Sequence, residues 1–101
     1  MKIKMTRSSG NVFKDLGFSA EEAEHLKIRS TMIAHLRELI ASRGLTQADA
    51  AALFGVSQPR VSDLVRGKID LFSIDTLVDM LNHAGVKIKF TLSDKSRSRA
   101  A

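Results

Sequence analysis

The segment of residues 45–67, LTQADAAALFGVSQPRVSDLVRG, constrains the fold more than any other part of the chain. It contains two short helix-forming runs, and each follows a residue that can cap a helix, Thr46 for the first and Ser57 for the second. Gly55 lies between the runs and can adopt the positive φ that a tight turn requires. Pro59 lies in the first turn of the second run, where its missing N–H removes no hydrogen bond. The segment therefore predicts two short helices joined by a tight turn.

The side chains of this segment are suited to two helices that cross closely. Ala51 is small enough for a close crossing, Val56 can fill the corner, and Val61 and Leu64, with Val65, supply an inner apolar face. At 100° per residue, the face opposite Val61 is small and polar. The outward residues are Pro59, Ser62, Asp63 and Arg66, with Arg60 on a flank.

Further helices are predicted on both sides of this pair. The run Ser19-Ala20-Glu21-Glu22 matches a capping box, and apolar residues recur at helical spacing from there to Gly44. One long helix, or two helices joined near residues 29–31, would fit this pattern equally well. Ser73 is expected to cap a last helix over residues 74–84, with Gly85 as its stop.

The period changes after Gly85. Residues 86–92, VKIKFTL, alternate strictly between apolar and polar, which predicts a half-buried strand. A strand needs a partner, which would be either residues 2–5 of the same chain or the same strand of a second subunit. The side chains expected to dimerise are Val86, Ile88, Phe90 and Leu92.

The predicted fold is mainly α, with four to five helices in one compact domain and a C-terminal β-strand. The expected organisation is a basic and apolar arm over residues 1–18, a helical domain over 19–85, the strand over 86–92 and a disordered basic tail over 93–101. Aromatic residues make up only 5% of the chain, which favours packed helices over a β-sandwich.

Composition and charge limit the classes of function that the chain can have. The chain has no cysteine, so it offers neither a disulfide nor a thiolate nucleophile, and we expect a cytoplasmic protein with no membrane span or secretory signal. Its net charge is +5, of which residues 1–10 carry +3 and residues 86–101 carry +4, so the middle carries −2. Basic ends on a near-neutral body are suited to contacts with phosphates.

Two short helices joined by a glycine-containing turn form the unit that many proteins use to read DNA. Residues 45–67 resemble the helix-turn-helix of the XRE family, the class of Cro and the phage repressors. Ala51, Gly55, Val61 and Leu64 stand at the family's mutual spacings, and Gln47 opens the first helix. The resemblance implies a repressor-like domain that places its second helix in the major groove.

The resemblance and the chemistry of the side chains imply roles for individual residues. Gln58 can pair with adenine and Arg60 with guanine, while Asp63 could accept from cytosine or instead pair with Arg66. The expected base-reading residues are Gln58, Pro59, Arg60, Ser62 and Asp63. The expected phosphate-binding residues are Thr46, Gln47, Ser57, Arg66 and Lys68.

The likeness extends beyond this unit. The motifs FSIDTL at residues 72–77 and LNHAG at 81–85 are similar to those of compact XRE regulators of the HigA-like antitoxin type. Such antitoxins repress their own operon as dimers and bind a RelE-like ribonuclease toxin. The expected toxin-binding surface is residues 11–26 or the basic C-terminus.

Three functions remain open: a stand-alone repressor, an antitoxin that is also a repressor, and a helix-turn-helix module that binds only proteins. Enzymatic activity is not expected, because His25, His35 and His83 are scattered and lack metal-ligand spacing. The expected partners are an operator in double-stranded DNA, a second copy and a RelE-like toxin, with no cofactor, metal or small-molecule substrate.

Overall fold

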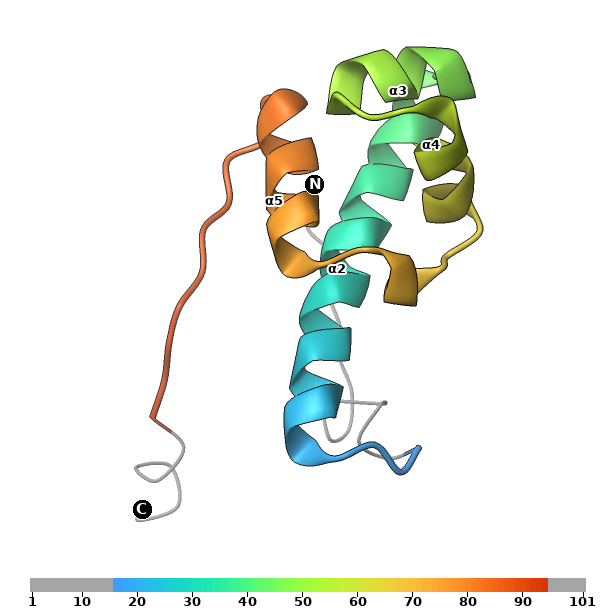
Figure 1. Ribbon diagram of the computed structural model, residues 1–101. Helices are drawn as coiled ribbons and strands as arrows, with labels where there is room; N and C mark the ends of the chain where they lie inside the picture. Colours follow the sequence, from blue (N-terminus) through green and yellow to red (C-terminus); the bar gives the residue numbers. More distant parts are fainter. Residues whose placement is uncertain (1–15, 95–101) are drawn as a thin grey trace.

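A single long helix organises the computed structural model, which describes residues 16–94 (Figure 1). This helix, α2 (Ala20–Arg43), runs without interruption through residues 29–31, so the one-helix alternative is correct. It begins at the expected capping box: Ser19 Oγ accepts from the Glu22 N–H at 3.1 Å, and Glu22 Oε1 accepts from the Ser19 N–H at 3.3 Å. It ends at Gly44, the expected stop, whose backbone is left-handed.

The remaining elements are short and follow each other closely. They are α3 (Gln47–Phe54), α4 (Gln58–Val65), the 3-10 turn η1 (Ile69–Leu71) and α5 (Ile74–His83). Thr46 and Ser73 cap α3 and α5 as predicted, each accepting from the N–H three residues ahead. Ser57 precedes α4, but its side chain makes no capping hydrogen bond. No sequence pattern predicted the turn η1.

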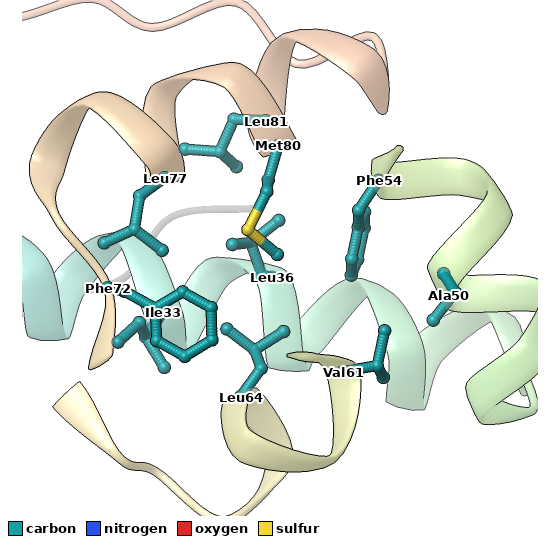
Figure 2. Packing of buried hydrophobic residues seen from close by; sticks show 11 residues of the cluster. Ile33, Leu36, Ala50, Phe54, Val61, Leu64, Phe72, Leu77, Met80 and Leu81 are labelled. Carbon is teal, nitrogen blue, oxygen red and sulfur yellow. The ribbon is translucent and has the colours of Figure 1, made fainter. Parts of the chain in front are cut away.

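One apolar core joins all of these elements (Figure 2). α5 lies alongside α2, while α3 packs against both α4 and α5. The largest fully buried side chains are Phe54, Phe72, Leu36, Leu64, Leu77, Met80 and Val61. Burying a side chain of this size contributes about 1.5–3 kcal/mol. The pair α3–α4 therefore depends on α2 and α5 for its stability.

The predicted strand over residues 86–92 is wrong for the single chain. The segment is extended and leaves α5 without joining a sheet, and residues 16–94 contain no strand at all (Figure 1). The physical reason is that a strand needs a partner backbone, and the described part of the chain offers none. The alternation of apolar and polar residues at the start of this segment reflects packing on the core instead, because Val86 and Ile88 contact it. Phe90 and Leu92, by contrast, are 78% and 85% exposed.

Several expectations fall on other parts of the chain. The proposed partner strand at residues 2–5, most of the 1–18 arm and the tail beyond residue 94 lie outside the described residues. Within residues 16–94, no helix combines the length and apolar character needed to cross a membrane.

Candidate nucleic-acid interface

The turn between α3 and α4 is tightly built. Gly55 has φ +70°, and the next residue, Val56, donates its N–H to the Ala51 carbonyl at 3.0 Å. A Cβ added to Gly55 would lie 2.9 Å from the ring of His83, at the end of α5. Glycine is thus favoured at this turn by its backbone conformation, and the exposed His83 ring packs against the space where a Cβ would lie.

Small side chains allow the two helices to cross closely. Ala50 and Ala51 of α3 are both buried, and Ala50 lies near Phe54 and Val61 in the core (Figure 2). On α4, Val61 and Leu64 are fully buried. The predicted inner face is confirmed, with Ala50 as an additional member, whereas Val65 is 37% exposed.

The opposite side of α4 forms a surface, which we call the α4 outer face, with the polar residues Gln58, Ser62 and Asp63 and the ring of Pro59. Gln58 and Pro59 are exposed, and Ser62 and Asp63 are partly exposed. Ser62 and Asp63 follow Gln58 and Pro59 by three to five positions, about one helical turn, so all four side chains lie along one side of the helix. This face begins at the N-terminus of α4, the end that enters a major groove in helix-turn-helix proteins.

Arg60 does not join the other expected base-reading residues. Its Nη2 donates to the Leu71 carbonyl at 2.9 Å, and its guanidinium carbon lies 4.4 Å from the centroid of the Phe72 ring. Arg60 is two residues from Gln58, so the two side chains leave the helix about 200° apart. The guanidinium is therefore turned toward η1 and the start of α5.

The expected phosphate-binding residues lie at both ends of the helix pair. Thr46 Oγ1 already accepts from the Asp49 N–H at 3.0 Å, and Gln47 and Ser57 are exposed at the starts of α3 and α4. Arg66 and Lys68 are exposed just beyond the end of α4. Sequence reasoning missed Arg37 of α2, whose Nη1 would lie 3.6 Å from a Cβ at Gly67. Arg37 thus places a cation beside Gly67, just beyond the end of α4, and its distance in sequence left no local signal.

No group of three or more His, Cys, Asp or Glu side chains within residues 16–94 could hold a metal ion.

Two short helices around a glycine turn, with a buried inner face and a polar outer face on the second, define a helix-turn-helix protein. A family model described as "Helix-turn-helix domain" matches residues 12–93, and the chain belongs to this family. A solved structure named as an XRE family transcriptional regulator is 35% identical, with a TM-score of 0.70 over 79% of this chain and 90% of that one. No curated protein matches the chain. The expected XRE-type helix-turn-helix fold is confirmed.

Proposed function

We propose that this protein is a transcriptional repressor that reads the major groove of its operator with α4, as a dimer. The observation that carries the proposal is the α4 outer face. It presents polar side chains at the N-terminus of a helix whose other side is locked into the core by Val61 and Leu64. The similarity to a protein named as an XRE family transcriptional regulator supports the same function.

The polar and charged residues of the interface have chemically suitable partners on DNA, whereas Pro59 can offer only an apolar contact. The Gln58 amide can donate to and accept from adenine, Ser62 can do either, and Asp63 can accept from cytosine or pair with Arg66. Thr46, Gln47 and Ser57 lie where helix N-termini favour phosphate oxygens, and Arg66 and Lys68 supply positive charge. The Arg60 guanidinium is not free to contact a base in this arrangement, because it contacts the Leu71 carbonyl and the Phe72 ring.

The function is tested by measuring fluorescence anisotropy of DNA from upstream of the gene, titrated with salt beside a scrambled duplex. A repressor should bind the native duplex at least ~10³-fold more tightly. Equal and steeply salt-dependent binding to both duplexes would instead show phosphate contacts alone. The module that binds only proteins would then be the better interpretation.

Replacing Gln58 by alanine should relax specificity at a single base pair. The loss of one bidentate contact is expected to cost about 1–3 kcal/mol at that position and little at the others. The measurement is the affinity for a set of operators, each with one substituted base pair. Lys68→Ala is the matched control, because the loss of a phosphate contact should weaken all sequences alike and flatten the salt dependence. A uniform loss for Gln58→Ala would contradict the assignment.

Of the four apolar side chains after α5 that were expected to dimerise, we propose that Phe90 and Leu92 form the contact with a second copy. Val86 and Ile88 already pack on the core, while Phe90 and Leu92 are almost fully exposed and would be covered by a second copy. Two recognition helices would then contact half-sites about one DNA turn, ~34 Å, apart.

Replacing Phe90 and Leu92 together by serine should shift the protein from dimer to monomer without unfolding it, because neither side chain belongs to the core. Sedimentation velocity at micromolar concentration measures the change, and the thermal unfolding midpoint serves as the control. A wild-type protein that sediments as a monomer would contradict the dimer.

An additional role as an antitoxin is favoured by the exposure of Leu16 and Phe18, which lie within the expected toxin-binding range of residues 11–26. The test is co-expression with a basic RelE-like protein encoded beside this gene, if the neighbouring gene encodes one. Co-purification that is lost on replacing Phe18 by serine would support the antitoxin. A locus without such a gene would favour the stand-alone repressor.

A further inference from the structure

The segment that joins η1 to α5 is held by arginines from two different helices. Arg60 of α4 donates from Nη2 to the Leu71 carbonyl at 2.9 Å and places its guanidinium 4.4 Å from the Phe72 ring centroid. Arg29 of α2 donates from Nη1 to the Phe72 carbonyl at 3.5 Å. Because the Phe72 side chain is itself buried in the core, the junction of Leu71 and Phe72 is a fixed point to which Arg60 ties α4.

The chemistry of the Arg60 contact makes it directional. A guanidinium is planar, so it can lie over an aromatic ring and still direct an N–H at a carbonyl oxygen. The Arg60 side chain is partly buried against the Phe72 ring, while its hydrogen bond to the Leu71 carbonyl is exposed to solvent. Without these contacts, only Val61 and Leu64 would hold α4, by its middle and its end, and its first turn would lose its attachment to the η1–α5 junction.

We propose that Arg60 is a positioning residue: it sets the orientation of α4 against the η1–α5 junction, so that the α4 outer face meets the base edges, and it reads no base itself. The proposal rests on the DNA-reading function proposed above. It replaces the guanine contact expected from sequence with an intramolecular role for the same guanidinium.

The test compares Arg60→Gln, Arg60→Lys and the base-reading control Gln58→Ala on operators with single base-pair substitutions. Measurements are made well below the unfolding midpoint, where every variant is fully folded. Arg60→Gln should weaken operator binding about tenfold, the effect of one such contact. The loss should be equal at every base pair, and affinity for a scrambled duplex should stay unchanged. Arg60→Lys keeps a cation over the ring and should recover part of the loss.

Two outcomes on DNA would overturn the proposal. If Arg60→Gln removed the preference at one base pair, Arg60 would be a base reader. If it lowered the unfolding midpoint and left operator affinity unchanged, its role would be stability alone.

A second measurement does not depend on DNA. In amide NMR spectra, Arg60→Gln should shift the resonances of Leu71 and Phe72 and also those of Leu64 and Val65, which lie beyond its immediate neighbours in sequence, whereas Gln58→Ala should perturb only its neighbours in α4. Unchanged resonances of Leu64 and Val65 in Arg60→Gln would overturn the positioning role. A wild-type protein that prefers no DNA sequence would overturn the proposed function instead, and the spectra would still decide whether Arg60 orients α4.

Discussion

Leu36→Ala is expected to lower the free energy of unfolding by about 2–5 kcal/mol, because it removes a fully buried side chain and leaves a cavity. Leu36 is 0% exposed at the middle of α2 and belongs to the cluster that joins this helix to the rest of the molecule (Figure 2). Domains of this size have only about 5–15 kcal/mol of total stability. A loss of this size therefore also reduces the folded fraction available to bind DNA at physiological temperature.

The matched control is Ile28→Ala on the same helix. Ile28 is 36% exposed and lies outside the core cluster, so this change should cost less than about 1 kcal/mol. Urea unfolding followed by circular dichroism measures both variants. Equal losses for the two would show that the α2 packing described above does not dominate stability.

Gly55→Ala is expected to cost about 1–2 kcal/mol from left-handed backbone strain, with a smaller steric conflict that the exposed His83 ring relieves by turning aside. The strain arises because Gly55 has φ +70°, and the conflict because the new Cβ would lie 2.9 Å from the His83 ring. The same unfolding measurement applies. Because the turn joins α3 to α4, operator affinity should fall as well.

Two further variants separate these contributions. Gly44→Ala introduces the same strain at φ +59° with no atom within 4 Å, so it should cost about 1–2 kcal/mol. In a His83→Ala background, Gly55→Ala should cost no more than Gly44→Ala. If removing His83 left the cost of Gly55→Ala unchanged, the contact with α5 would contribute nothing.

Local signals predicted most of the fold. The capping residues Ser19, Thr46 and Ser73 interact with backbone groups three residues away, so their neighbours in sequence determine where each helix begins. The strand over residues 86–92 failed for the opposite reason, since pairing depends on a second backbone that no local pattern can supply. The apolar residues of this segment pack on the core only as far as Ile88.

In the candidate interface, too, some residues were placed correctly by local sequence pattern and others depend on tertiary contacts. Helical periodicity placed Val61 and Leu64 inside and Pro59 and Ser62 outside, because both faces follow from position along a single helix. It placed Arg60 only on a flank. The partners of Arg60, Leu71 and Phe72, lie 11 and 12 residues further on and come close only through tertiary packing.

During synthesis, α3 and α4 leave the ribosome before the residues of α5 that complete their core. Leu77, Met80 and Leu81 emerge about 0.5 to 3 seconds after Gly67, given ordinary rates of translation. Until then Phe54 and Leu36 lack much of their packing. We therefore expect a nascent chain to acquire its ability to occupy an operator only once α5 has been made, and chains truncated before Ser73 to be substrates for proteases rather than partial regulators.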